Sequence, residues 1–137
     1  MVNIRTARKT DLNECAKLSK LSELQIDERK YPDKKYLSEF LGSLFVVAED
    51  NKKVIGYALG EKEKYKVVSL NILVVDKKFR GRGIGKLLLN EFIKRAKELG
   101  LKELYTFVPK WNEKTMNFYK NNKFYDMKYY AYFTKKI

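Results

Sequence analysis

The sequence predicts an α/β (α+β) domain with a mixed, mostly antiparallel central sheet flanked by about four helices. The apolar, β-branched run Val67–Val75 indicates a strand buried on both faces, and a glycine-rich turn leads from it into a helical pattern. Before it, two strand-like segments around a short polar turn indicate a β-hairpin. After the long helix, another strand-like segment follows, as a parallel crossover requires. The expected order is β-α-α-β-β-β-α-β-α-β, where the last segment forms one bent strand or two short ones.

The chain is expected to begin with a strand and a long helix. Val2–Ala7 is predicted to be the strand. Thr10 and Asp11 offer N-cap chemistry for the helix, and Glu14 follows Asp11 by three residues, as in a capping box. Apolar residues at helical spacing continue this helix to about Arg29.

A second helix and the hairpin come next. Pro32 suits the first turn of that helix, and Gly42 is expected at its C-cap. Leu44–Glu49 and Lys53–Gly60 are predicted to be the two hairpin strands. Gly56, inside the second of them, indicates a bulge or close packing.

The C-terminal part is predicted to contain two more helices and the last strands. A long amphipathic helix follows the glycine-rich turn and ends at Gly100. Leu104–Val108 is expected to pair in parallel with the central strand. Asn112 can cap a helix over Glu113–Asn121, and Phe124–Lys136 is aromatic and expected to be extended.

Composition limits the class of protein. A chain of 137 residues suggests one domain spanning 1–137, large enough to bury a core. No apolar run approaches the roughly 20 residues that span a membrane, and the polar N-terminus does not resemble a signal peptide. The single cysteine, Cys15, agrees with a reducing cytoplasm. Without histidine, we expect no zinc site, and no triad that depends on histidine can form.

The turn after the central strand allows three phosphate-binding interpretations. A Rossmann fingerprint needs a third glycine where Lys86 stands, and a Walker A loop needs one more residue and a hydroxyl where Leu87 stands. The pattern R/Q-x-x-G-x-G/A is matched by Arg80, Gly83 and Gly85. This pattern closely resembles the acetyl-CoA loop of the GCN5-related N-acetyltransferases (the GNAT superfamily). The alternative is a glycine-rich turn that binds no ligand.

A second signature extends the resemblance over essentially the whole chain. The run Asn112-x6-Tyr119-x4-Phe124 is similar to the family's N-x-x-(A)-x-x-x-Y-x-x-x-G-F. Lys123 stands where the family has glycine, and Thr115 where it has a small residue. The resemblance implies the GNAT fold and an acetyl-CoA-dependent N-acetyltransferase. Such an enzyme moves an acetyl group to a primary amine, of a small molecule or a protein, by direct transfer in a ternary complex.

The resemblance also implies where acetyl-CoA or coenzyme A, the co-substrate, binds. Pantetheine would pair with the backbone of Leu73 and Val75 as an added strand, with an oxyanion donor near Val74. The diphosphate would lie on backbone N–H groups around Arg82–Lys86, at a helix N-terminus. The expected cofactor-binding residues are Leu73, Val74, Val75, Arg80, Gly81, Arg82, Gly83, Ile84, Gly85, Lys86, Asn112 and Tyr119. Asn112 has an alternative role as a plain N-cap.

Tyr119 is the predicted catalytic residue. A phenol with a pKa of about 10 can donate a hydrogen bond or proton to a leaving thiolate with a pKa of about 8.5. Packing is the alternative role for this tyrosine.

No general base is assigned. Family members carry a glutamate at positions that match Ser69 or Phe107, and neither can act as a base. Ser69 and Asn71 could instead order a water relay. The acids that such a relay could reach are Glu61, Glu63, Asp27 and Glu28.

Two other functions compete with catalysis. A non-catalytic CoA-binding regulatory module is suggested by the missing base. A nucleic-acid-binding protein is suggested by the basic C-terminal half, where residues 76–137 hold 16 Lys/Arg against 6 Asp/Glu, and by the aromatic tail around Tyr129 and Tyr132. Alternating aromatics suit a packed sheet better, so nucleic acid ranks last. We expect no membrane partner, an unidentified amine substrate, and a monomer or homodimer.

Overall fold

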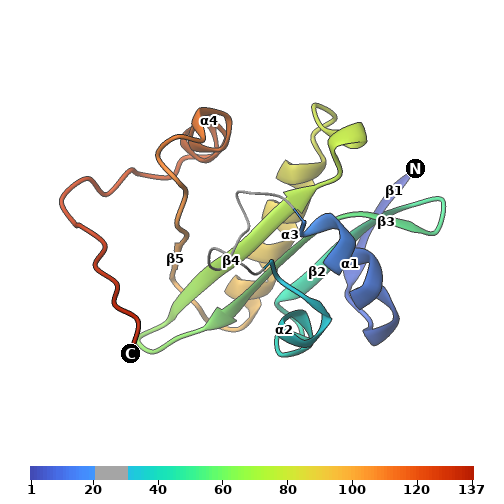
Figure 1. The fold of residues 1–137 in the computed structure, drawn as a ribbon, viewed down its shortest axis with the longest axis horizontal. Coiled ribbons are helices and arrows are strands. Elements are labelled where there is room, and N and C mark those ends of the chain that lie inside the picture. The colour runs from blue at the N-terminus through green and yellow to red at the C-terminus, as the bar shows by residue number, and fades with distance from the viewer. Residues whose placement is uncertain (21–30) are drawn as a thin grey trace. The chain divides into compact units, whose positions relative to one another are not determined.

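Five strands form one sheet in the order β1-β2-β3-β4-β5 within residues 1–107 of this computed structural model (Figure 1). The structure describes residues 1–20 and 31–137. Residues 1–107 form one compact unit and residues 108–137 another, and each is described by itself. The strands are β1 (Val2–Thr6), β2 (Phe45–Asp50), β3 (Lys53–Lys62), β4 (Val67–Val75) and β5 (Glu103–Tyr105). Among the strands of the described residues, β4 and β5 alone pair in parallel, which confirms the predicted mixed, mostly antiparallel sheet.

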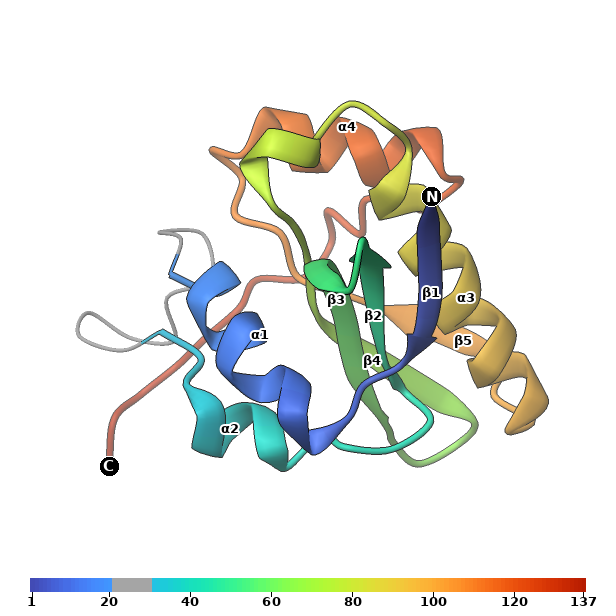
Figure 2. The same cartoon turned by 90° about the vertical axis from the view of Figure 1, so that its right-hand side faces the viewer.

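Helices cover both faces of this sheet, with α1 and α2 on one face and α3 on the other (Figure 2). Their bounds are α1 (Leu12–Leu18), α2 (Lys34–Ser38) and α3 (Ile84–Glu98). Side chains of the strands and of α3 are fully buried, among them Phe45 on β2, Tyr57 on β3 and Phe92 on α3. Within the described part of the chain, no helix combines the length and apolar character needed to cross a membrane.

The predicted hairpin forms from β2 and β3. Its turn residues Asn51 and Lys52 have φ angles of 50° and 64°, the left-handed geometry of a two-residue type I′ turn. The register shifts between Ala48 and Glu49, opposite Gly56. A Cβ atom at Gly56 would lie 2.8 Å from a carbonyl oxygen of β4, so both predicted reasons for glycine are confirmed.

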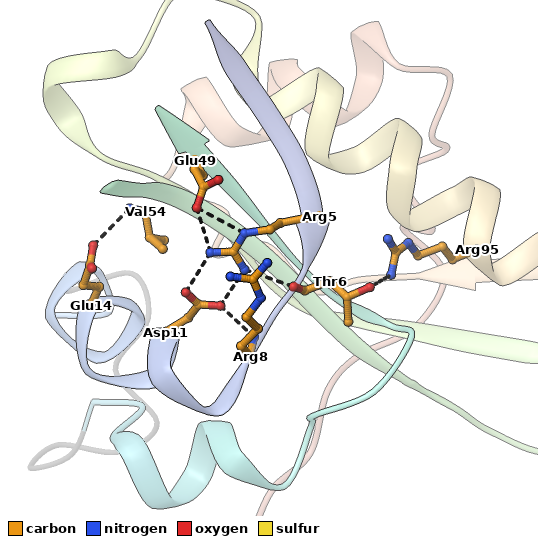
Figure 3. Close-up of polar contacts among 8 residues, drawn as sticks. All are labelled: Arg5, Thr6, Arg8, Asp11, Glu14, Glu49, Val54 and Arg95. Carbon is orange, nitrogen blue, oxygen red and sulfur yellow. Dashed lines mark hydrogen bonds and ion pairs between the residues drawn. The ribbon is translucent and has the colours of Figure 1, made fainter. Parts of the chain in front are cut away.

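Arg5 on β1 holds the start of the chain to the hairpin (Figure 3). Its guanidinium donates to the Asp11 carboxylate at 2.8 and 2.9 Å and to Glu49 at 2.8 and 3.1 Å. The Arg8 N–H also donates to Asp11, at 2.6 Å. Burial would by itself raise the pKa of Asp11, but these hydrogen bonds outweigh it and hold the pKa below its ordinary value.

The capping box predicted for α1 is wrong. Asp11 precedes the helix but makes no side-chain cap bond to it, because Arg5 and the Arg8 N–H occupy its carboxylate. Glu14 instead accepts a hydrogen bond from the Val54 N–H at 3.0 Å. Both acids therefore satisfy donors outside the helix that would otherwise be costly to bury.

The ends of the first two helices also differ from prediction. The expected continuous helix is wrong, since α1 ends at Leu18 in a turn, and the remainder up to Arg29 falls mostly on residues 21–30, outside the described residues. The prediction that Pro32 lies in the first turn of α2 is wrong, because Asp33 is the N-cap and its carboxylate accepts a helix N–H at 2.8 Å. Gly42 lies beyond the helix end and is not its C-cap.

Residues 108–137 contain α4 (Glu113–Asn121), the fourth helix that was predicted. Asn112 caps it by accepting a hydrogen bond from the Thr115 N–H at 3.2 Å, as predicted. The one bent strand or two short strands expected over Phe124–Lys136 do not form, because this segment contains no strand. Strands are stabilised by pairing with a neighbour, which aromatic alternation alone does not supply.

Replacement of Asp11 by alanine should destabilise the protein by about 3 kcal/mol near neutral pH, because it leaves the half-buried Arg5 guanidinium short of one partner. The pKa of Asp11 is lower in the folded protein than in the unfolded chain, where it is about 4. The free energy of unfolding that Asp11 contributes is therefore fully present above the unfolded pKa and is lost as pH falls through the folded pKa. Urea unfolding at neutral and acidic pH measures both effects. Asp50→Ala, which removes a surface pair with the exposed N-terminus, is the control and should change little. Equal losses in the two variants would contradict this account.

Candidate active site

Strands β4 and β5 pair over only three residues and then separate. Val67, Val68 and Ser69 face Glu103–Tyr105, and the ladder stops there. Immediately beyond it, the Thr106 hydroxyl donates to the Leu70 carbonyl at 2.8 Å. A side chain thus replaces the backbone donor that a continuing strand would have supplied. The strand predicted over Leu104–Val108 is therefore shorter than expected at its C-terminal end.

An extra residue in β4 lies at the same point. Leu59 pairs with Ile72, whereas the next residue, Gly60, pairs with Leu70, so Asn71 has no partner on β3. Such a bulge bends the strand and increases its local twist. Residue 60 must be glycine, because a Cβ atom there would lie 1.9 Å from the Ser69 carbonyl oxygen.

The backbone of β4 beyond the bulge faces the edge from which β5 has separated. The Asp76 N–H donates to the Ile55 carbonyl at 2.7 Å, which fixes the alternation of this antiparallel pair. Leu73 and Val75 therefore direct their N–H and C=O groups away from β3, as pairing with an added strand needs. By the same alternation the N–H of Val74 faces β3, so an oxyanion donor is offered more directly by its two neighbours.

The glycine-rich turn begins α3 without a side-chain cap. Gly81 and Gly83 have φ angles of 79° and 78°, which L side chains rarely adopt. Gly83 is the N-cap of this 15-residue helix, no side chain caps it, and its first turn carries no acid. The first N–H groups of the helix have no intrahelical acceptors and stand at the positive end of its dipole. The predicted loop thus has the backbone form of an anion-binding site, and α3 includes Ile84 and Gly85 as well as Lys86.

Two arginines of this turn make contacts that hold it in place, one with the end of β4 and one with a ring in the turn. Arg80 Nε donates to the Val75 carbonyl at 3.0 Å and ties the turn back to the end of β4. The Arg82 guanidinium lies 5.1 Å from the centre of the Phe79 ring, a cation–π contact.

Polar side chains gather at the bulge, on the sheet and α2. Ser69 Oγ lies 2.8 Å from Asn71 Oδ1 and 3.3 Å from the Glu61 carbonyl oxygen. Burial raises the pKa of Tyr36 on α2, and its hydrogen bond with Asn71 opposes that effect. Tyr105 joins this group from β5, where it is the register partner of Ser69.

Tyr105 connects the group to an acid. Its hydroxyl donates to the Glu63 carboxylate. This hydrogen bond is the main cause that raises the pKa of Tyr105, and burial is the second, whereas a hydrogen bond with Ser69 lowers that pKa. Sequence reasoning named Ser69, Asn71 and Glu63 but missed Tyr105. The signal was the parallel pairing itself, since it places Tyr105 beside Ser69 once the register is known.

The other residues considered in the search for a base are placed differently. Phe107 is exposed and its ring meets that of Tyr105 with centres 5.6 Å apart. Glu61 contributes its backbone carbonyl to the group. Asp27 and Glu28 lie outside the described residues.

Tyr119 belongs to the second unit, residues 108–137. It is buried, and its ring lies 5.2 Å from that of Phe118 and 5.0 Å from that of Phe124. The packing role considered for it is therefore present. The catalytic role of Tyr119 and the cofactor contact of Asn112 stay predictions, as does the union of both units in one domain.

The sequence model of the Acetyltransferase (GNAT) family matches residues 10–124. The chain belongs to this family. The chain is also similar to a curated relative, an uncharacterized N-acetyltransferase of Methanocaldococcus jannaschii, to which it is 31% identical over 130 residues. That match covers 85% of this chain and 58% of the relative, so the chain spans little more than half of the relative's length.

Solved structures show the same GNAT fold. Ard1 of Thermoplasma volcanium matches with a TM-score of 0.82 at 20% identity, over 95% of this chain and 89% of Ard1. PaiA N-acetyltransferase of Thermoplasma acidophilum, solved in complex with coenzyme A, matches with a TM-score of 0.74 at 22% identity, over 89% and 88% of the two chains. These likenesses confirm the predicted fold class.

Replacement of Gly60 by alanine should destabilise the protein by about 3 kcal/mol or more, because the new methyl group overlaps the Ser69 carbonyl at the bulge. Gly56→Ala is the matched control from the same strand, where the nearest atom lies at 2.8 Å rather than 1.9 Å. Thermal and urea unfolding compare the two variants. A Gly60→Ala variant that is as stable as the wild type would show that the bulge does not require glycine at residue 60.

Proposed function

We propose that this GNAT chain is an acetyl-CoA-dependent N-acetyltransferase that moves an acetyl group to a primary amine by direct transfer in a ternary complex. The observation that carries the proposal is the combination of the β4–β5 separation with the uncapped N-terminus of α3. The first exposes a strand edge for an amide-bearing chain, and the second offers backbone donors for a diphosphate. Pantetheine-linked diphosphate is a ligand with both features.

The chain's own residues divide the work as follows. The backbone of Leu73 and Val75 would bind and orient the pantetheine arm, and N–H groups at Arg82–Lys86 would hold the diphosphate. The Arg80 guanidinium supports the turn through the Val75 carbonyl. Acetyl-CoA supplies the thioester, so the protein must orient the amine, remove its proton and stabilise the oxyanion.

Tyr119 is proposed to donate a proton or hydrogen bond to the departing thiolate. Asn112 is proposed to contact the cofactor in addition to capping α4. A cytoplasmic location and a monomeric or homodimeric state remain predictions that accompany this function.

A non-catalytic CoA-binding module is the second candidate. It is favoured by Ser69 and Phe107, which stand where family members carry a glutamate base. Turnover of acetyl-CoA with an amine distinguishes an enzyme from such a module.

Gly83→Asp should abolish coenzyme A binding, because it places a carboxylate where the diphosphate is proposed to bind. Gly100→Asp is the matched control, since Gly100 has the same φ of 78° and the same open space around it but lies at the other end of α3. Isothermal titration with acetyl-CoA, coenzyme A and ATP measures binding. Retention of affinity in Gly83→Asp, or equal loss in both variants, would remove the loop from the site.

Tyr119→Phe should lower kcat by about 100-fold while the Kd for coenzyme A stays within about two-fold, because a proton donor is removed and the ring is retained. A thiol-release assay with a lysine peptide, a peptide with a free N-terminus, spermidine and kanamycin identifies a working amine. Tyr125→Phe, an exposed tyrosine of the same unit, is the control. An unchanged kcat in Tyr119→Phe would leave this tyrosine with a packing role alone.

A further inference from the structure

A chain of hydroxyl groups runs from the bulge in β4 to a carboxylate at the surface. It starts at Ser69, continues at its register partner Tyr105 on β5, and ends at Glu63 in the turn between β3 and β4, to which the Tyr105 hydroxyl donates. The Lys102 N–H donates to the Lys66 carbonyl at 2.7 Å and holds this turn beside the start of β5. All of these residues belong to the first unit.

The hydrogen bonds give the chain a direction. Tyr105 has one hydroxyl proton and donates it to Glu63, so its oxygen can accept from the other side. Ser69 is the register partner of Tyr105 on the parallel strand, and its hydroxyl donates to Asn71 Oδ1 at 2.8 Å. Because a serine hydroxyl rotates, Ser69 can donate to either neighbour. Protons can therefore move from Ser69 to Tyr105 and from Tyr105 to Glu63.

The inner end of this chain lies where the strands separate. Ser69 is the last residue of β4 that pairs with β5, and Asn71 is the extra residue of the bulge. The strand edge proposed to hold pantetheine begins two residues further, at Leu73. An amine that attacks a thioester on this edge would thus stand close to Ser69.

We propose that Glu63 is the terminal proton acceptor of the reaction and that it acts through Tyr105 and Ser69. This inference rests on the proposed acetyltransferase activity. Ser69 and Phe107 stand at the positions that match the family's glutamates, and neither can act as the base. The proposed route carries the amine proton to a carboxylate instead.

The proton transfer balances as the new bond forms. The amine nitrogen bonds to the acetyl carbon, the carbon–sulfur bond breaks, and the sulfur leaves as thiolate. The nitrogen becomes acidic during this attack and gives its proton to Ser69 Oγ, as Ser69 gives its own to Tyr105 Oη and Tyr105 gives its own to Glu63. The products are an amide and a protonated Glu63 carboxyl.

Glu63 can pass the proton to water because it lines an open hollow at the surface. The end of β3 contributes Lys62 and the turn contributes Lys64, Tyr65 and Lys66 to this hollow, and the α3–β5 connection contributes the uncharged residues Leu99, Gly100 and Leu101. The charged groups that face Glu63 here are thus these three lysines. Glu61 is the other acid whose charge acts on Tyr105.

The test compares Glu63→Gln and Tyr105→Phe with Glu103→Gln, which removes the same charge from an exposed position on β5. The kcat/KM for the working amine should fall at least about 10-fold near neutral pH in the first two variants, as loss of an acid–base group does. The deficit should shrink toward about pH 10, because hydroxide can then accept the proton of the attacking nitrogen in place of the relay. The double variant should be no slower than either single one, because both remove the same route.

Each other outcome has a definite meaning. A deficit in kcat/KM that is equal at all pH values would assign Glu63 and Tyr105 a structural role and overturn the relay. The relay would also be overturned if the kcat/KM of Glu63→Gln and Tyr105→Phe equalled that of Glu103→Gln. Coenzyme A affinity, measured by titration, should be unchanged in every variant. A wild-type protein that binds coenzyme A but acetylates no amine in the screen would overturn both the relay and the enzyme assignment. If the wild type acetylates an amine and the Glu63→Gln variant does so equally fast, the relay alone would be overturned.

Discussion

The single extra residue in β4 is the constraint on which the site depends. Antiparallel pairing with β3 forces the strand to bend at Asn71, and the bend needs Gly60 opposite because the backbones approach too closely for a side chain. The bent strand cannot keep its parallel partner, so β5 ends and the Thr106 hydroxyl satisfies the Leu70 carbonyl. One local irregularity therefore produces an open strand edge inside an otherwise continuous sheet.

The same strand also aims the helix that follows it. The Asp76 N–H bonds to Ile55 and the Arg80 side chain bonds to Val75, so the turn is tied to the end of β4 before α3 begins. The N-terminus of α3 thus stands at the end of the open edge. Backbone donors of a strand and of a helix then adjoin each other, which suits a ligand that combines amides with a diphosphate.

Local signals predicted the elements whose geometry depends on a few neighbouring residues. The turn at Asn51 and Lys52, the positive φ of Gly83 and the N-cap of Asn112 all follow from preferences that act over two to four residues. The acids at the start of α1 were interpreted by the same local rule, and there it failed. Asp11 and Glu14 had partners on β1 and β3, and buried donors outweigh a cap on the surface.

By itself, the sequence determined the order of the elements through α4, the glycine turn and the family signatures, because periodicity and turn chemistry are properties of contiguous residues. The tertiary structure alone decided the link between Ser69, Tyr105 and Glu63, which come from two strands and a turn. Their proximity depends on the register of the parallel pair, and register is set by how whole strands pack. It also decided that the aromatic C-terminal segment forms no strand, since a strand exists only where another backbone pairs with it.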